Sequence, residues 1–304
     1  GCKQLITGFQ SMETTGIELA DIFRLYLNDF LNRYKLPLAY FKVIRAIKAC
    51  RTVALGGHID TCDSCNHQRI SYNSCRNRHC PKCQFLAKEK WIENISSYLL
   101  PIPYFHLVFT IPAELHEIAK HNQEFFYKLL FRASSETLKE VSSSKKFLGA
   151  TPGFISLLHT WGQNLSFHPH IHIIFMGGGL KSVNSEWVST KPDYLFPVKL
   201  LSRLFRGKML AYLKEEAASN NLIKSETLEP MLSSLYGKEW VVYTKPSFQN
   251  AEHVVKYLGR YTHRIAISNH RILSAVDGKV SFNWRDYKDG KKKDVIMGCY
   301  GFGP

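Results

Sequence analysis

The stretch His168–Leu180, HPHIHIIFMGGGL, is the part of the sequence that decides the fold. Side chains of a β-strand alternate between its two faces. His168, His170 and His172 therefore share one face, and the apolar residues among them point to the other. The three consecutive glycines are expected to end the strand. The sequence thus predicts one strand that presents three imidazoles side by side.

Strands and helices alternate around this segment. Further strands are expected at residues 104–111, 153–160 and 240–244, with a hairpin over 265–284 that turns at Asp277-Gly278. Apolar residues at helical spacing predict a helical pair over 18–49 and helices over 85–99, 112–130, 198–218 and 250–261. Strands and hairpins mixed with helices favour an α+β fold with a largely antiparallel central sheet.

Composition narrows the class of partner. The chain has 304 residues, of which 45% are hydrophobic and 13% aromatic, so it can bury real cores. The sequence contains no run of about 18 apolar residues, so it does not predict a membrane span. Lys and Arg number 40 against 25 Asp and Glu, which gives a net charge of +15. Such an excess indicates a polyanionic partner, either nucleic acid or an anionic membrane surface.

Cysteines cluster in one short segment. Cys62-x2-Cys65 and Cys80-x2-Cys83 are separated by 14 residues, and two such pairs can supply four thiolates to Zn²⁺. The start of the chain does not resemble a signal peptide, so we expect metal ligands in a reducing cytoplasm rather than disulfides. The remaining candidate ligands are Cys75 and His79, with His58 and His67 for a second or variant site.

Basic side chains accompany the cysteines. Arg76, Arg78 and Lys82 lie between and beside the predicted zinc ligands. A zinc module with this charge is suited to binding the phosphate backbone of DNA. The alternative is a structural zinc clip whose basic face is merely solvated.

The histidine strand predicts a second metal site. His170 and His172 stand two residues apart, so their neutral imidazoles can chelate one divalent cation. A cation held beside basic residues can polarise a phosphodiester. The alternative is that the three histidines are core residues whose hydrogen bonds are satisfied within the fold. Their position on a common face is less consistent with that alternative.

Two tyrosines follow further along the chain. Tyr257 and Tyr261 are one helical turn apart, so both hydroxyls can point to one site. A tyrosine with a pKa near 10 is a poor nucleophile unless a metal and nearby cations activate the reaction. The surrounding cations expected to contact DNA are Lys256, Arg260 and Arg264. Taken alone, such a pair is more typical of core packing.

With these motifs in order, the chain resembles the two-tyrosine rolling-circle transposases of bacterial insertion sequences, within the HUH nuclease superfamily. The matching segments are Ser71–Gln84, His168–Leu180 and Tyr257–Arg271. The resemblance implies an N-terminal helical region (1–50), a zinc-binding DNA-contact module (51–100) and an HUH nuclease domain with a central antiparallel sheet (101–304). The family continues past the point corresponding to Lys291, so the resemblance also implies a truncated C-terminus.

The resemblance implies a mechanism as well. Tyr257 and Tyr261 would attack single-stranded DNA at transposon ends, leave a 5′-phosphotyrosine link, and later join the strand to target DNA. His170 and His172 would hold Mg²⁺ or Mn²⁺. The remaining candidates for the third ligand of this cation are His168, His253, His159 and Gln163, of which His253, one turn before Tyr257, is preferred.

Three other functions fit parts of the sequence. A replication initiator or conjugative relaxase would share the HUH chemistry. A non-catalytic, zinc-dependent DNA-binding remnant would need the cysteines only. A histidine-triad nucleotide hydrolase would use the alternating histidines without a metal, and would need neither the zinc module nor the tyrosines. The oligomeric state and the DNA target do not follow from the sequence.

Overall fold

The chain forms two compact units. Unit 1 comprises Gly1–Lys90, Gln163–Leu165 and His263–Pro304, and unit 2 comprises Trp91–Gly162 and Ser166–Thr262. The computed structural model describes residues 16–162, 164–181, 186–191, 195–220, 225–248, 253–254, 257, 259, 265–285 and 291–298. This division differs from the expected domains, because the segment after residue 262 groups with the N-terminal region rather than with the nuclease domain.

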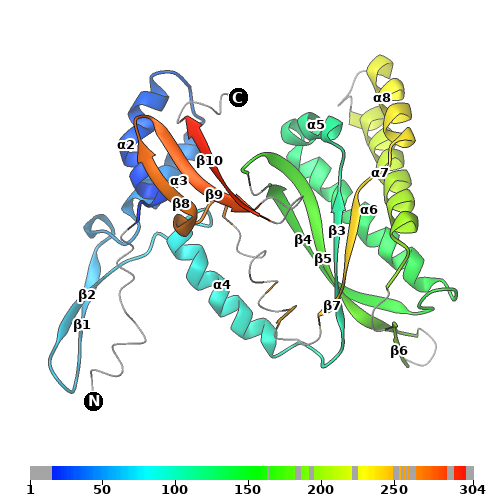
Figure 1. Cartoon of the computed structure of the whole chain (residues 1–304), viewed down its shortest axis with the longest axis horizontal. Helices are drawn as coiled ribbons and strands as arrows, with labels where there is room; N and C mark the ends of the chain where they lie inside the picture. The colour runs from blue at the N-terminus through cyan, green and yellow to red at the C-terminus, as the bar shows by residue number, and fades with distance from the viewer. Residues whose placement is uncertain are drawn as a thin grey trace. The chain divides into compact units, whose positions relative to one another are not determined.

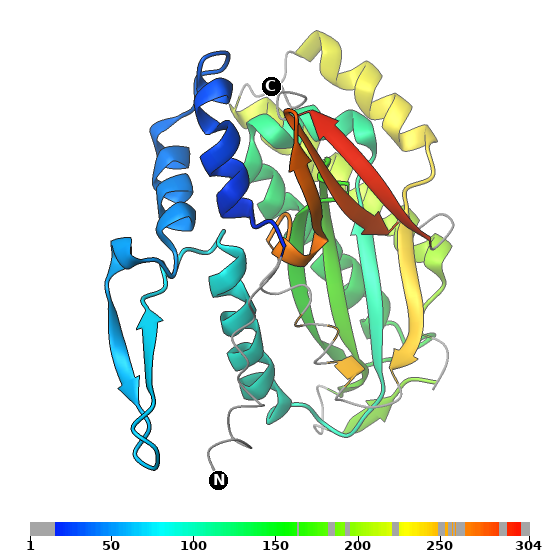
Figure 2. The ribbon, with the colours of Figure 1, turned by 60° about the vertical axis from the view of Figure 1, so that its left-hand side comes forward.

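Unit 1 begins with the expected helical pair, α2 (Leu19–Leu31) and α3 (Leu38–Ala49), which lie side by side (Figure 2). A short 3₁₀ turn (Val53–Leu55) leads to an antiparallel hairpin of β1 (Gly57–Thr61) and β2 (Gln68–Tyr72). Both hairpin strands are largely exposed. Helix α4 (Pro81–Ser96) follows, and the division between the units falls within it.

The C-terminal part of unit 1 is a three-stranded antiparallel sheet. Its strands are β8 (Ile272–Val276), β9 (Lys279–Arg285) and β10 (Lys292–Gly298), in the order β10-β9-β8. The expected turn at Asp277-Gly278 is confirmed, since both residues have the positive φ that a tight hairpin needs. A 3₁₀ turn (Asn269–Arg271) precedes β8, so the first strand starts later than expected.

Unit 2 is built on a five-stranded antiparallel sheet, which confirms the predicted fold class. The strands are β3 (Tyr104–Thr110), β4 (Thr151–Trp161), β5 (Phe167–Leu180), β6 (Trp187–Ser189) and β7 (Val242–Phe248). Their order is β4-β5-β3-β7, with β6 paired to the end of β5. Strands β3 and β5 are therefore central, and the histidine segment lies in the middle of the sheet.

Helices cover one face of this sheet (Figure 1). They are α5 (His116–His121), α6 (Gln123–Ser143), α7 (Val198–Asn220) and α8 (Ser225–Gly237), with a 3₁₀ turn (Ala113–Leu115) before α5. Leu107, Phe109, Ile171 and Ile173 point to this side and are fully buried. The alternation of β3 and β5 sends their histidines to the opposite face. Among the helices described, none is long and apolar enough to cross a membrane.

Candidate metal centres and nucleophile

Strand register brings three histidines together on the face of the sheet opposite the helices of unit 2. His159 of β4 lies directly opposite His170 of β5, and His172 is two residues further along the same face. One ring nitrogen from each lies within 4.8 Å of the others, and all three residues are buried. The three imidazoles therefore form a compact group that strand pairing holds in place.

Hydrogen bonding fixes the orientation of the central imidazole. Nδ1 of His170 donates to the backbone carbonyl of His168 at 2.6 Å, because a carbonyl oxygen can only accept. That bond leaves Nε2 of His170 with its lone pair, 3.0 Å from Nε2 of His172. A ring nitrogen tied to a carbonyl on one side and facing other imidazoles on its free side is typical of a metal-ligating histidine.

The donor set fits a divalent transition metal. The group contains three neutral nitrogens and no carboxylate. Imidazole nitrogens suit transition-metal cations, whereas Mg²⁺ prefers oxygen ligands and water. Three protein ligands would leave further coordination positions for phosphate oxygens or water.

A fourth histidine, His106 of β3, connects this group to Tyr257. Its Nε2 lies 2.8 Å from Nδ1 of His172, and its Nδ1 lies 3.0 Å from the hydroxyl oxygen of Tyr257. The rings of His106 and His172 are stacked at 5.1 Å. Burial, helped by the charge of Lys245, lowers the pKa of His106 to about 4, so the ring is neutral at pH 7. No motif in the sequence assigns this residue a role.

Tyr257 is anchored by apolar contacts next to its hydroxyl. The described residues around it, His253, Val254 and Gly259, have helical backbone. Val254 is fully buried and packs with Tyr104 and Ile174, and Tyr257 packs on the edge of the same cluster. The phenol is half-buried, with its oxygen directed at His106. Five of the candidate site residues lie outside the described residues: Gln163, Lys256, Arg260, Tyr261 and Arg264.

The third histidine of the group is His159, not the preferred His253. His253 is exposed, and His168 contributes its carbonyl rather than its ring to the group. The ring of His168 lies 5.2 Å from that of His116 and 5.1 Å from that of His170 between centroids, and it is not part of the group of three. The preference was wrong because it relied on local spacing, whereas His159 is placed by antiparallel pairing between β4 and β5.

Four cysteines form a second metal-binding group, in unit 1. Cys50, Cys75, Cys80 and Cys83 have their sulfur atoms within 4.8 Å of one another. Sγ of Cys83 lies 3.6 Å from Sγ of both Cys50 and Cys75. Four thiolates at about 2.3 Å from Zn²⁺ would be spaced about 3.8 Å apart in tetrahedral geometry. The arrangement therefore fits a structural zinc site.

Burial favours the protonated form of two of these thiols, so a bound cation would have to displace their protons. Burial raises the pKa of the Cys75 thiol to about 11 and raises that of Cys80 further. Zn²⁺ displaces such protons and compensates the charge of the thiolates. The cysteines also pack against Ala20 and Ile47 of the helical pair, so the site joins α2 and α3 to the start of α4.

This group corrects the predicted zinc ligands. Cys80 and Cys83 belong to it and Cys75 was a candidate, but Cys62 and Cys65 are not members and Cys50 was missed. Cys62 and Cys65 lie in the turn between β1 and β2, where the backbone N–H of Cys62 donates to the carbonyl of His67. The prediction assumed that the two CxxC pairs form one site. In the structure Cys62 and Cys65 lie in the hairpin turn between β1 and β2, whereas Cys80 and Cys83 lie at the start of α4.

The remaining predicted ligand and the basic residues also have defined positions. Nε of Arg78 donates to Nε2 of His79 at 3.2 Å, and His79 is not part of the cysteine group. Arg76 and Arg78 are exposed. Nζ of Lys82 lies 2.7 Å from a carboxylate oxygen of Glu18, so that charge is partly compensated within the unit.

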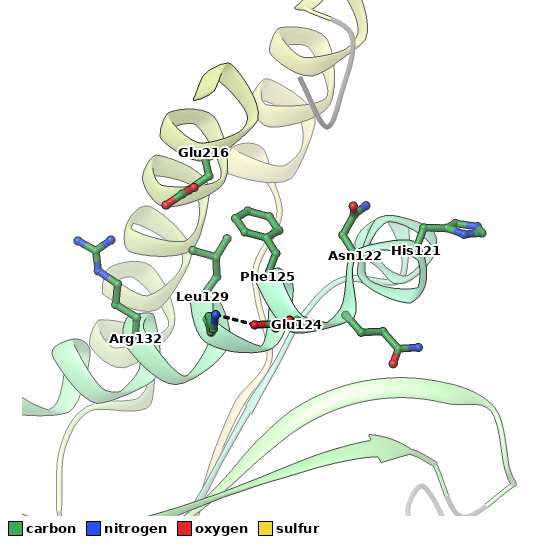
Figure 3. Close-up of a pocket in the computed structure, with 9 residues that line it drawn as sticks. His121, Asn122, Glu124, Phe125, Leu129, Arg132 and Glu216 are labelled. Atoms are coloured by element: carbon green, nitrogen blue, oxygen red, sulfur yellow. Dashed lines mark hydrogen bonds and ion pairs between the residues drawn. The ribbon is translucent and has the colours of Figure 1, made fainter. Parts of the chain in front are cut away.

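A cavity of about 600 Å³ opens among α5, α6 and α7 of unit 2 (Figure 3). Its lining includes Phe125, Leu129, Arg132 and Glu216. None of the histidines that face Tyr257 lines it, so it is separate from the candidate catalytic group.

The sequence matches two known protein families. Residues 153–302 match the family described as "Putative transposase", and residues 22–111 match the "Transposase zinc-binding domain". The first match includes His159, His170, His172 and Tyr257, and the second includes all four clustered cysteines.

Two curated relatives are similar over most of the chain. One, "Putative transposase y4qJ" of Sinorhizobium fredii, is 44% identical over 295 residues, which cover 94% of this chain and 74% of the relative. The other, "Transposase for insertion sequence element IS801" of Pseudomonas savastanoi pv. phaseolicola, is 28% identical over 263 residues, or 81% of this chain and 61% of the relative.

Solved structures offer a more distant likeness. Part of the chain is similar to the conjugative relaxase TrwC in complex with oriT DNA, at 12% sequence identity and a TM-score of 0.29. That alignment covers 51% of this chain and 68% of the relaxase. A complex of the same relaxase with mutant oriT DNA gives 13% identity and a TM-score of 0.30.

Proposed function

The chain belongs to the family of transposases represented by these matches, and from that premise we propose that it cuts and rejoins single-stranded DNA at the ends of an insertion element through Tyr257. The observation that carries this proposal is the hydrogen-bonded chain from the Tyr257 hydroxyl through His106 to His172. A tyrosine held beside a metal-binding group is what nucleophilic cleavage of a phosphodiester requires.

The reaction keeps the phosphorus in a diester, because a bond to tyrosine replaces the bond to the 3′ oxygen. The phenolic oxygen of Tyr257 forms a bond to phosphorus, the bond from phosphorus to the 3′ oxygen breaks, and the phenol loses its proton while the 3′ oxygen gains one. The products are a 5′-phosphotyrosine and a free 3′-hydroxyl. A later attack by a 3′-hydroxyl of target DNA can reverse the step and join the strands, because no water has consumed the ester. Tyr261 would serve the second cleavage.

His159, His170 and His172 would hold the catalytic cation. When bound, the cation would neutralise charge on the phosphate oxygens. Of the two predicted ions, the all-nitrogen donor set favours Mn²⁺ over Mg²⁺. The cysteine group would hold a structural Zn²⁺ that stabilises unit 1.

Basic residues would bind the DNA backbone. Arg76 and Arg78 are exposed beside the zinc ligands and are available to phosphates, and Lys82 is expected to contribute less because of its ion pair with Glu18. Lys256, Arg260 and Arg264 are proposed from the sequence to contact the strand near Tyr257. The protein would act on DNA in the cytoplasm.

The proposal is tested by trapping the covalent intermediate. A single-stranded oligonucleotide carrying the element end, labelled at its 3′ end, should give a labelled, SDS-resistant adduct with the full chain in Mn²⁺. The label is placed there because the downstream fragment carries the 5′ phosphate. Tyr257→Phe should lose the adduct, and so should the double variant with Tyr261→Phe.

Tyr236→Phe is the matched control, since this tyrosine of α8 is exposed and distant in sequence from the histidines. It should form the adduct as the unaltered protein does. An adduct that persists in the double variant would show that the nucleophile is another residue. Nucleotide hydrolysis that EDTA does not affect would favour a histidine-triad enzyme instead.

A further inference from the structure

Strand β7 carries two exposed side chains that the proposed mechanism does not use, Tyr243 and Lys245. The strand forms one edge of the five-stranded sheet, next to the central strand β3 (Figure 1). Val242 of β7 is buried in the core under the helices, so strand alternation sends Tyr243 and Lys245 to the face that carries the histidines. Tyr243 is 52% exposed, and Lys245 is exposed as well.

Strand register places both side chains beside the candidate catalytic group. Lys245 lies directly opposite His106. Tyr243 lies directly opposite Val108, and Val108 is paired on its other side with His172. Because neighbouring strands are about 4.8 Å apart, Tyr243 lies about 10 Å from His172 across the sheet. A phosphate held by the histidines would therefore leave its neighbouring nucleotide within reach of β7.

Lys245 supplies charge that this face otherwise lacks. Across the five strands described for this sheet, it is the only lysine, arginine, aspartate or glutamate. After burial, the charge of Lys245 is the largest cause that lowers the pKa of His106, so the ammonium is close enough to act on the site. A single cation beside neutral imidazoles attracts the phosphate backbone of DNA.

Tyr243 offers the second kind of contact that binds single-stranded DNA. Its ring belongs to none of the four apolar clusters formed by the described residues. An exposed aromatic ring next to a cation is typical of sites where a base stacks while a phosphate is neutralised. Such stacking needs an unpaired base, so this pair of side chains is suited to a single strand rather than a duplex.

An alternative role for Lys245 is protection of the sheet edge, because lysine on an edge strand discourages pairing with other chains. The next residue, Pro246, already lacks the N–H that such pairing needs. Edge protection also gives no reason for an exposed tyrosine two residues earlier on the same face.

We propose that Tyr243 and Lys245 form a subsite for the nucleotide next to the scissile phosphate, in which Tyr243 stacks on the unpaired base and Lys245 binds the backbone phosphate. The two contacts hold the strand across β7 while the scissile phosphate lies at the histidines. This inference rests on the proposed function of the same site.

The binding test is fluorescence anisotropy of the full chain with a labelled single-stranded oligonucleotide carrying the element end, without added divalent cation. Tyr243→Ala should raise the dissociation constant about tenfold, and Tyr243→Phe, which keeps the ring, by less than about twofold. Lys245→Gln should lower the slope of log affinity against log salt by about 0.7, the value for one phosphate of a single strand, whereas Lys245→Arg should keep the slope. Tyr236→Ala and Lys139→Gln, at exposed positions of α8 and α6, are the controls and should change neither quantity.

Modified oligonucleotides assign each contact to one position of the strand. An abasic site at the stacked position should weaken binding to the unaltered protein about tenfold and to Tyr243→Ala less than about twofold, because the variant has already lost the stacking. In the same way, a neutral methylphosphonate at the bound phosphate should weaken binding to the unaltered protein but not to Lys245→Gln. Both positions are expected next to the cleaved phosphodiester.

Single-turnover formation of the SDS-resistant adduct in Mn²⁺ gives a second readout. Tyr243→Ala should raise the half-saturating DNA concentration about tenfold and change the rate at saturating DNA by less than about threefold, because its ring does not touch the reacting atoms. Both altered side chains are exposed, so the variants should keep the melting temperature of the unaltered protein.

Three results would overturn the inference: unchanged affinity in Tyr243→Ala, an unchanged salt slope in Lys245→Gln, or abasic and methylphosphonate penalties as large in the variants as in the unaltered protein. Self-association of Lys245→Gln with normal DNA binding would assign the lysine to edge protection instead. Failure of the proposed function is a different result. DNA would still bind through Tyr243 and Lys245, but the adduct would survive removal of Tyr257 and Tyr261 or would not form at all.

Discussion

At the scale of single residues, each candidate centre depends on atoms contributed by distant parts of the chain. The histidine group combines His159 with two residues of β5. The cysteine group combines Cys50, the C-cap of α3, with Cys80 and Cys83 at the start of α4. In each group, residues outside a spaced motif join a pair that the motif predicts. His159 joins the histidine pair, and Cys50 and Cys75 join the cysteine pair.

The zinc assignment can be tested by matched substitutions. Cys75→Ser should lose one zinc per chain and destabilise unit 1, because three thiolates and a hydroxyl hold Zn²⁺ less well than four thiolates. Cys65→Ser, in the exposed hairpin turn, should retain that zinc. The measurement is the zinc content of purified protein together with thermal unfolding.

The opposite pattern would contradict the cysteine group. If Cys65→Ser lost the zinc and Cys75→Ser kept it, the hairpin turn would be the tightly binding site. Cys50→Ser provides an independent check, because Cys50 is 2% exposed and should behave as Cys75→Ser does.

At the scale of elements, the glycines at 177–179 do not end β5, as the sequence suggested. The strand continues to Leu180, and Gly179 within it is paired with Pro152 of β4 on one side and with Val188 of β6 on the other. A Cβ at Gly179 would lie 2.4 Å from the carbonyl oxygen of Thr151, so only glycine allows the neighbouring backbone to approach this closely. The glycines therefore extend the strand by admitting both neighbours.

This explanation predicts opposite effects for two glycine substitutions. Gly179→Ala should destabilise unit 2 by about 1–3 kcal/mol, because backbone must move to accommodate the methyl group. Gly207→Ala should stabilise it by about 0.5–1 kcal/mol, because Gly207 lies within α7 and a Cβ there meets nothing within 4 Å. Denaturant unfolding of both variants would measure the difference, and equal effects would contradict the role of close approach at Gly179.

At the scale of the whole molecule, unit 1 is assembled from both ends of the described chain. Ile267, Ile272 and Phe282 form a core with Leu19 and Ile22 from the N-terminal helix. The backbone N–H of Leu19 also donates to the side chain of Asn269 at 3.2 Å. The C-terminal sheet is therefore part of the unit that contains the cysteine group, although unit 2, more than half of the chain, intervenes in sequence.

Removing the central side chain of this core should loosen both of its parts. Phe282→Ala should cost about 3–5 kcal/mol, since Phe282 is 1% exposed. Hydrogen exchange should increase in α2 and in β8–β10 together and stay unchanged in β3–β5. Val276→Ala, at an exposed position of β8, is the control and should have no such effect. Increased exchange confined to β8–β10 would show that the sheet is not part of the same cooperative unit.

Much of the architecture follows from local patterns in the sequence. The helical pair, the strands around residues 104–111 and 153–160, the histidine strand and the hairpin at Asp277-Gly278 were all predicted, and the structure confirms them. Strand alternation also placed His170 and His172 on one face. Strands β1, β2, β6 and β10 and helix α8 were not predicted, and for β1 and β2 the reason is that exposed polar strands show little alternation of apolar residues.

By itself, the sequence determined the fold class, the two residue types that could bind metal, and the motifs shared with transposases. Tertiary structure alone decided that His159 completes the histidine group, that Cys50 belongs with Cys80 and Cys83, and that His106 lies between His172 and Tyr257. The physical reason is that the spacing of residues along the sequence indicates only which face of a helix or strand a side chain occupies. Which elements meet, and in which register, depends on packing between segments that are far apart along the chain.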